Sequence, residues 1–121
     1  MNKVISLFAL ITLLSLFACQ NDSKSPMLVG EWHGAAWTLN GQDAGRDFAS
    51  VKFEFKADGT YATQFGNQKE SGTYRMEGME LYTTGENKIE KMVSFSKIAK
   101  DSLVMDMNRQ GDSEQLVLVR K

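Results

Sequence analysis

The sequence contains one cysteine, one proline and one histidine among its 121 residues. A lone cysteine excludes a disulfide within the chain, and without a second cysteine or histidine the usual zinc and iron ligand sets are missing. A nucleophilic catalytic site would have only this one histidine as its general base. The chain also has no Gly-x-Ser-x-Gly motif. We therefore expect no metal, no cofactor and no enzymatic activity.

The chain also lacks an excess of either charge. Its 14 basic and 15 acidic residues give a net charge of −1 and are interspersed along the sequence. Because nucleic-acid-binding proteins carry clustered basic residues, nucleic acid is not an expected partner. Glu31, Glu54 and Asp106 could be paired as glycosidase carboxylates, but the strand alternation described below places Glu54 and Asp106 on the outside of the sheet.

Only one long apolar run is present, from Val4 to Ala18, preceded by Lys3. It is about fifteen residues long, shorter than the roughly 20 needed for a membrane-spanning helix, so a cleaved signal sequence is preferred over a retained anchor. The run ends in Leu16-Phe17-Ala18-Cys19, which resembles the lipobox of bacterial lipoproteins, although Phe17 is larger than the residue usual there. The alternative is an ordinary signal peptide followed by an incidental thiol.

The lipobox resemblance implies that Cys19 becomes the first residue of the mature protein and carries the lipid that attaches it to a membrane. Residues 1–18 are then a signal peptide, residues 19–26 a lipidated tether and residues 27–121 the folded domain. Gln20 replaces the aspartate that in many bacteria retains lipoproteins at the inner membrane, so the resemblance favours the outer membrane. It leaves open which side of that membrane the domain occupies.

After Pro26, apolar residues alternate with polar ones, and Gly, Asn and Asp recur at short intervals. This pattern is typical of short antiparallel strands. Asp58-Gly59 is the strongest hairpin signal, because its residues readily adopt positive φ. The expected strands cover residues 28–39, 51–55, 61–65, 72–76, 79–84, 89–98, 102–108 and 114–120.

The segment from Ile89 to Val93 also suits one helical face, but Val93 and Phe95 favour a strand. Eight strands joined by short hairpins can form a sandwich or an antiparallel up-and-down β-barrel, and we favour the barrel because closure removes both sheet edges. The connections at 40–47 and 66–70 are expected to be long and those at 57–59 and 77–78 tight. One barrel end would then be closed by tight turns, with a flexible loop over the other.

Several short motifs together resemble the small bacterial lipocalin-like lipoproteins of the calycin type. They are Gly30-Glu31-Trp32, residues 48–61 ending in Asp-Gly-Thr-Tyr, Gly72-Thr73-Tyr74, Leu103-Val104 and Leu118-Val119-Arg120. The resemblance implies that Trp32 packs at the closed end of the barrel beneath Arg120, as a structural pair. A biotin site is not expected, because later strands lack the tryptophans that such a site requires.

The interior of an eight-stranded barrel is either filled by side chains or holds one small ligand. The expected inward-facing set is apolar and rich in methionine, which adapts to irregular ligands. Tyr61 and Tyr74 are candidates for placing hydroxyls near the mouth, and Trp37 lies near the expected loop. The candidate ligand-binding residues are Trp37, Phe53, Phe55, Tyr61, Tyr74, Phe95, Met105 and Met107.

Two functions remain open on the sequence. The first is a lipid-anchored envelope protein that holds a hydrophobic or amphipathic small molecule without a covalent bond. The second is an interaction or inhibitor module that binds an envelope protein through its outer face or loops. In this case the interior of the barrel is filled by its own side chains. A spacer or assembly role is a weaker third.

Overall fold

The structure is a computed structural model that describes residues 25–108 and 110–121. The predicted signal peptide, Cys19 and most of the predicted tether lie outside the described residues. Within the described part of the chain, no helix is both long and apolar enough to cross a membrane.

Most of the described chain is β-strand. A single turn of helix, α1 (Ser25–Leu28), precedes the strands, and a short 3-10 helix, η1 (Phe48–Ser50), interrupts them. The strands are β1 (Gly30–Leu39), β2 (Gln42–Asp43), β3 (Val51–Phe55), β4 (Thr60–Phe65), β5 (Gln68–Glu77), β6 (Glu80–Gly85), β7 (Glu90–Ile98), β8 (Ser102–Asp106) and β9 (Glu114–Arg120).

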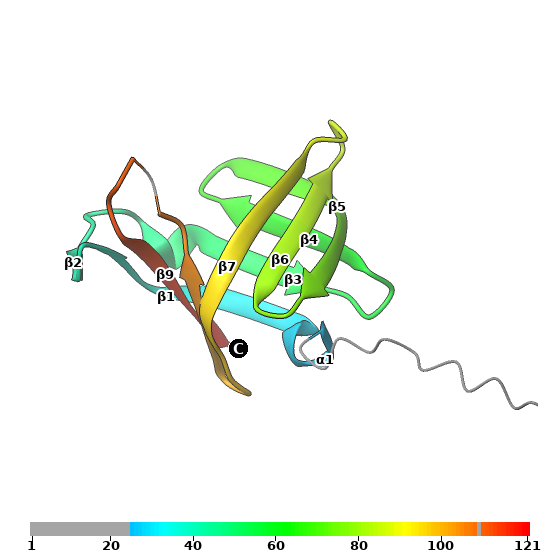
Figure 1. The fold of residues 1–121 in the computed structure, drawn as a ribbon, viewed down its shortest axis with the longest axis horizontal. Coiled ribbons are helices and arrows are strands. Elements are labelled where there is room, and N and C mark those ends of the chain that lie inside the picture. Colours follow the sequence, from blue (N-terminus) through cyan, green and yellow to red (C-terminus); the bar gives the residue numbers. More distant parts are fainter. Residues whose placement is uncertain (1–24, 109) are drawn as a thin grey trace, which may run out of the picture.

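The strands form one antiparallel sheet that closes on itself (Figure 1). The order is β2-β1-β3-β4-β5-β6-β7-β8-β9, and β1 also pairs with β9, from Trp32 opposite Arg120 to Leu39 opposite Glu114. The eight longer strands therefore make an up-and-down barrel, which confirms the predicted all-β fold and excludes the sandwich. β7 confirms the strand predicted around Ile89–Ile98.

Three local predictions were wrong. Leu28 belongs to α1, and the first strand begins at Gly30. The loop after β1 contains the two-residue strand β2, which folds back to pair with Thr38 and Leu39. The expected long connection at 66–70 is a turn of only two residues, because Gln68 already pairs with Phe65. Gly66 makes this tight turn possible, with a φ of 60°.

The two barrel ends differ. At one end lie α1, the turns after β3, β5 and β7, and the C-terminus, and we call it the closed end (Figure 1). At the other end, the mouth, lie the segment from Asn40 to Ser50 and the connections after β4, β6 and β8. This asymmetry follows from the meander, since alternate connections of an up-and-down sheet emerge at the same end.

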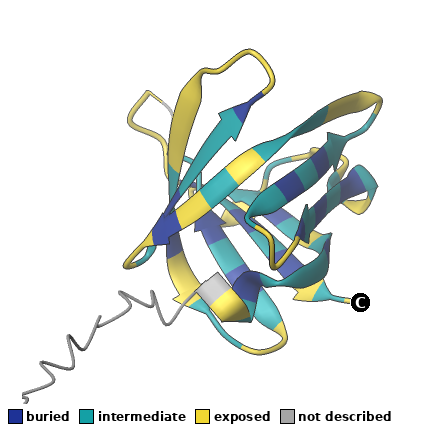
Figure 2. Ribbon diagram, turned by 90° about the vertical axis from the view of Figure 1, so that its right-hand side faces the viewer, coloured by how far each residue is buried: buried dark blue, intermediate teal, exposed yellow. Residues whose placement is uncertain are grey.

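Buried and more exposed residues alternate along the strands, and Figure 2 shows this alternation as repeated buried bands. In β3, Val51, Phe53 and Phe55 are buried while Lys52 and Glu54 are half-buried. The buried apolar core comprises Leu28, Trp32, Trp37, Val51, Phe53, Phe55, Tyr61, Met76, Leu81, Phe95, Leu103, Met105, Leu116 and Leu118. Tyr74, Val93 and Met107 are partly buried and pack against it.

Candidate functional site

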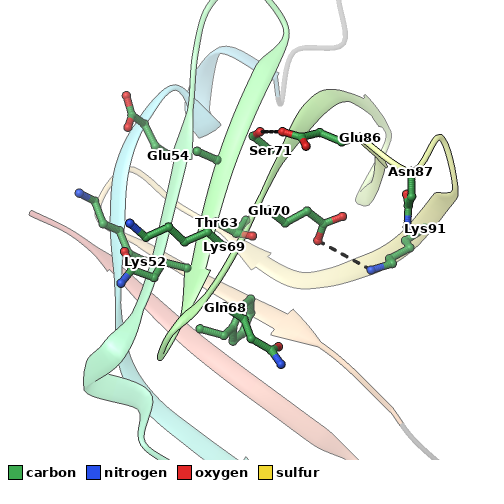
Figure 3. Close-up of a pocket in the computed structure, with 13 residues that line it drawn as sticks. Lys52, Glu54, Thr63, Gln68, Lys69, Glu70, Ser71, Glu86, Asn87 and Lys91 are labelled. Atoms are coloured by element: carbon green, nitrogen blue, oxygen red, sulfur yellow. Dashed lines mark hydrogen bonds and ion pairs between the residues drawn. The ribbon is translucent and has the colours of Figure 1, made fainter.

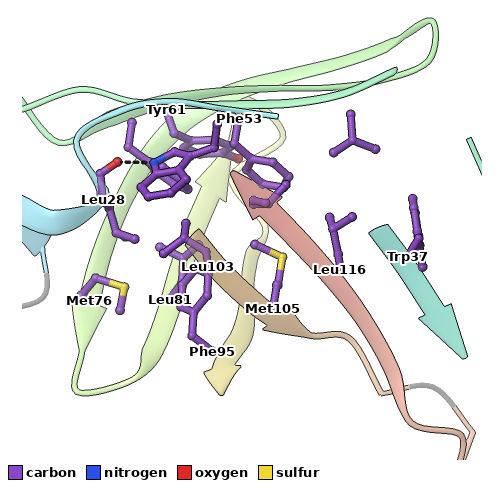
Figure 4. Packing of buried hydrophobic residues seen from close by; sticks show 14 residues of the cluster. Leu28, Trp37, Phe53, Tyr61, Met76, Leu81, Phe95, Leu103, Met105 and Leu116 are labelled. Carbon is purple, nitrogen blue, oxygen red and sulfur yellow. Dashed lines mark hydrogen bonds between the residues drawn. The ribbon is translucent and has the colours of Figure 1, made fainter. Parts of the chain in front are cut away.

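The closed end is sealed by Trp32 and Arg120. Trp32 is fully buried, and its indole nitrogen donates to the carbonyl of Leu28 at 2.8 Å (Figure 4). The Arg120 guanidinium carbon lies 4.1 Å from the centroid of the Trp32 ring. This cation–π contact joins the first barrel strand to the last.

The same guanidinium ties down the chain that enters the barrel. It donates to the carbonyls of Val29 and Met27 at 2.7 Å each and to that of Lys100 at 2.9 Å. Gly30, two residues before the tryptophan, has a φ of 130°, and a Cβ there would collide with Nη1 of Arg120. The Gly-x-Trp spacing is therefore explained by space for the arginine as well as by backbone conformation.

A second tryptophan lies at the mouth. The Trp37 indole nitrogen donates to Oε1 of Glu114 at 2.6 Å, and both residues are buried. Arg46, from the loop after β2, lies 3.4 Å from the same oxygen and 5.3 Å from the centroid of the Trp37 ring. Phe65 packs edge-on against Trp37, with centroids 6.1 Å apart. These contacts attach the loop to the rim of the barrel.

An open cavity of about 350 Å³ lies at the mouth of the barrel. Its walls differ in character. The polar part of the lining, which we call the polar wall, comes from β4 to β7 and comprises Tyr61, Thr63, Glu70, Thr83 and Lys91. The remaining lining is mostly apolar and comprises Phe53, Phe65, Leu81, Met92, Val93, Met105 and Met107, with Asp106 and Asn108 where β8 ends.

Four of the eight candidate ligand-binding residues line this cavity: Phe53, Tyr61, Met105 and Met107. Trp37 stands beside it, in contact with the lining residue Phe65. Phe55, Tyr74 and Phe95 belong to the packed core and its edge and do not line the cavity. The side chains of this core are shown in Figure 4.

The predicted role of Tyr74 required its hydroxyl to lie near the mouth, but the structure places it at the closed end. Its hydroxyl donates to the carbonyl of Lys56 at 2.8 Å, in the turn after β3, and its ring packs edge-on against Phe55. β5 runs from the mouth toward the closed end, so a residue late in this strand reaches the wrong end for contact with the cavity.

Tyr61 carries the most unusual polar group of the cavity. The residue is 3% exposed, and its hydroxyl is buried without a hydrogen-bond partner in the described part of the chain. Burial raises the pKa of this phenol, and the nearby Glu70 carboxylate raises it further. The hydroxyl therefore stays protonated at neutral pH and can act as a hydrogen-bond donor.

The sequence predictions missed the charged pair of the polar wall. The Lys91 ammonium lies 3.7 Å from Oε2 of Glu70. Alternation alone places Lys91 on the same face as Val93, and Glu70 faces inward because it pairs with Thr63 across the short turn. The inward position of Glu70 was not predicted, because residues 66–70 were expected to form a connection and not part of a strand.

A larger hollow, of about 780 Å³, spans the β3–β5 part of the sheet and the connection after β6 (Figure 3). It is lined partly by outward-facing side chains such as Lys52, Glu54 and Lys69 and shares Thr63, Phe65, Glu70 and Lys91 with the cavity. Ser71 donates to Glu86 across it at 2.9 Å. Because it is bordered by exposed charges on the outer face, it is a less suitable place for an apolar molecule than the interior.

The single histidine lies away from the cavity. A ring nitrogen of His33 lies 2.8 Å from Oε1 of Glu31, and the Lys52 ammonium lies 3.2 Å from the same oxygen. Over residues 25–108 and 110–121, no group of three or more His, Cys, Asp or Glu side chains is placed to hold a metal ion.

The fold and the sequence agree on one family. The model of the lipocalin-like domain matches residues 28–105. The chain belongs to the lipocalin-like family. The matched region runs from the end of α1 through most of β8, and in the structure β9 completes the lipocalin-like barrel by pairing with β1.

Solved structures show the same fold at low sequence identity. A lipocalin-like protein from Bacteroides uniformis ATCC 8492 superposes with a TM-score of 0.60 at 14% identity, covering 78% of this chain and 99% of that one. A DUF4847 family protein from Bacteroides vulgatus ATCC 8482 gives 0.59 at 13% identity, covering 82% and 97%. An uncharacterized protein from Bacteroides eggerthii DSM 20697 gives 0.57 at 13% identity, covering 78% and 99%. Comparison with curated proteins gave no match.

Proposed function

We propose that this lipocalin-like protein binds a small hydrophobic or amphipathic molecule, without a covalent bond, in the cavity inside its barrel. The observation that carries the proposal is the cavity of about 350 Å³, which is lined by both apolar and polar side chains. This volume lies at the lower end of the roughly 300–1,000 Å³ found for small-molecule pockets. The proposed action is sequestration or transfer, with no catalysis.

The position of the cavity supports this function over a self-filled interior. The closed half is packed around Trp32, Phe55 and Leu103, whereas the lining residues Val93 and Met107 remain only partly buried. The packed half gives the barrel its stability, and the mouth half leaves room for a ligand. Methionines at 105 and 107 can adapt to the shape of an apolar molecule.

Fluorescence of N-phenyl-1-naphthylamine tests the proposal. We expect saturable enhancement with the wild-type domain and competition by medium-chain amphiphiles. Val93→Phe adds bulk inside the cavity and should weaken probe binding at least about fivefold, while Val117→Phe, the same change on the outer face of β9, should leave binding unchanged. Absence of saturable probe binding to a folded wild-type domain would refute the function.

We further propose that Cys19 is lipidated and anchors the protein to the outer membrane. The supporting observation is the apolar run that ends in Leu-Phe-Ala-Cys after a basic residue. Metabolic labelling with an alkyne fatty acid should mark the wild type and not Cys19→Ser, and the label should co-sediment with outer-membrane fractions. Equal labelling of Cys19→Ser would exclude this cysteine as the attachment site.

A second candidate function is recognition of an envelope protein. Ile89 lies in the connection after β6 and is 57% exposed, next to the charged hollow, and Met92, near the start of β7, is 53% exposed. If this surface binds a protein, Ile89→Ser should abolish a crosslink to one defined envelope partner while probe binding in the cavity persists. An unchanged crosslinking pattern would argue against it.

A further inference from the structure

Each charged side chain that lines the cavity has a partner within the protein. Glu70 and Lys91 form an ion pair at 3.7 Å, with side chains 36% and 60% exposed, so they lie toward the mouth. The Asp106 carboxylate accepts a hydrogen bond from Gln115 Nε2 at 2.9 Å. Among the described lining residues, Lys91 is the only cation, and Glu70 already neutralises it.

The polar groups deeper in the wall are hydroxyls. Tyr61 offers a buried donor without a described partner, and Thr63 and Thr83 line the same wall. A buried donor left without an acceptor costs free energy, so a ligand that supplies an acceptor gains affinity by completing this hydrogen bond. The same cavity offers Phe53, Met105 and Val93 to an apolar chain.

We infer that the bound molecule is an uncharged amphiphile whose head group, such as an alcohol, amide or ester carbonyl, accepts a hydrogen bond from the Tyr61 hydroxyl. This inference rests on the proposed function and specifies its ligand class. A carboxylate finds no unpaired cation among the described lining residues. An alkylammonium group has no lone pair to accept the hydrogen of Tyr61.

Competition by octyl compounds that differ only in their head group, with an apolar reference compound, tests the inference. The probe is N-phenyl-1-naphthylamine at pH 7.5, and the competitors are 1-octanol, octanamide, octanoate, octylamine and the wholly apolar hexylbenzene. With the wild type, we expect 1-octanol and octanamide to displace the probe at concentrations at least about tenfold lower than octanoate and octylamine.

Two variants separate head-group recognition from simple hydrophobicity. Glu70→Gln leaves Lys91 unpaired and should improve octanoate binding about tenfold relative to that of 1-octanol. Glu54→Gln, the same change on the outer face of β3, is the control and should alter neither. Tyr61→Phe should weaken 1-octanol and octanamide about fivefold and leave hexylbenzene unchanged.

The outcomes are distinguishable. Octanoate binding more tightly than 1-octanol to the wild type overturns the head-group class while leaving the proposed function intact. Equal effects of Tyr61→Phe on 1-octanol and hexylbenzene, or no effect on either, also overturn it. Failure of the probe and all five competitors to bind overturns the proposed function and this inference together.

Discussion

The guanidinium of Arg120 covers the Trp32 indole at 4.1 Å while donating to three main-chain carbonyls around it. One side chain thereby holds the start of β1, the turn after β7 and the end of β9 together. Closure of a barrel depends on the pairing of its first and last strands, and this contact lies where that pairing begins.

Removal of the tryptophan should destabilise the barrel without affecting the cavity. Trp32→Ala deletes a fully buried side chain, and such deletions cost about 3–5 kcal/mol. Urea unfolding measures the loss. The variant should still bind the fluorescent probe where it is folded, because Trp32 does not line the cavity. A free energy of unfolding within about 1 kcal/mol of wild type would remove Trp32 from its structural role.

Arg120→Lys should also destabilise, although it keeps the charge. An ammonium lacks the planar fork that reaches several carbonyls at once and stacks on the indole. The expected loss is about 1–3 kcal/mol, measured by the same unfolding experiment. Lys121→Arg, at the neighbouring position, is the control and should have no effect.

Tyr61→Phe should stabilise the ligand-free protein. The hydroxyl is buried without a described partner, so deleting it removes a desolvation cost of about 1 kcal/mol or more. Thermal unfolding of wild type and variant without ligand measures the difference. A loss of stability of about 1 kcal/mol would instead mean that the hydroxyl is hydrogen-bonded in the empty protein.

Trp37→Phe should destabilise more than Arg46→Ala, although both residues contact the Glu114 carboxylate. The indole N–H is a buried donor at 2.6 Å, and loss of a hydrogen bond to a charged group costs about 1.5–3 kcal/mol. Arg46 is half-exposed, and exposed ion pairs contribute about 1 kcal/mol or less. The reverse order in urea unfolding would show that the arginine carries the attachment.

The Asp58 turn should make stability depend on acid pH. The hydroxyl and main-chain N–H of Thr60 donate to Asp58 at 2.6 and 2.9 Å, and they lower the pKa of this carboxyl below its ordinary 3.8. The folded pKa lies below the unfolded one, so the stabilisation is present above the unfolded pKa and is lost as pH falls through the folded pKa.

Asp58→Asn should therefore be less stable than wild type at pH 7, and the difference should shrink near pH 2. Urea unfolding at both values measures it, with Asp101→Asn in the turn after β7 as the matched control. A difference that stays constant between the two pH values would show that the Asp58 charge does not contribute.

Alternation predicted the barrel because burial in a strand follows a period of two. Phe53 and Phe55 in one strand, and Leu116 and Leu118 in another, needed no knowledge of neighbours to be placed inside. The local sequence did not predict how far each strand extends. The sequence predicts a long connection at residues 66–70, whereas the tight turn at Gly66 places Glu70 in the sheet opposite Thr63.

The cavity depends on tertiary information that no single segment holds. Phe55 and Phe53 have the same pattern along β3, yet only Phe53 lines the open half. The difference arises from which strand ends meet at the mouth and how bulky the opposite walls are. Likewise, the partnership of Trp37 with Glu114 joins residues 77 positions apart.

The described chain begins with α1, beside the Trp32 seal and on the side of the barrel opposite the mouth. An anchor at the proposed Cys19 would therefore be attached through the sealed end. The chain that carries the lipid would enter the barrel on the side away from the opening through which a small molecule passes.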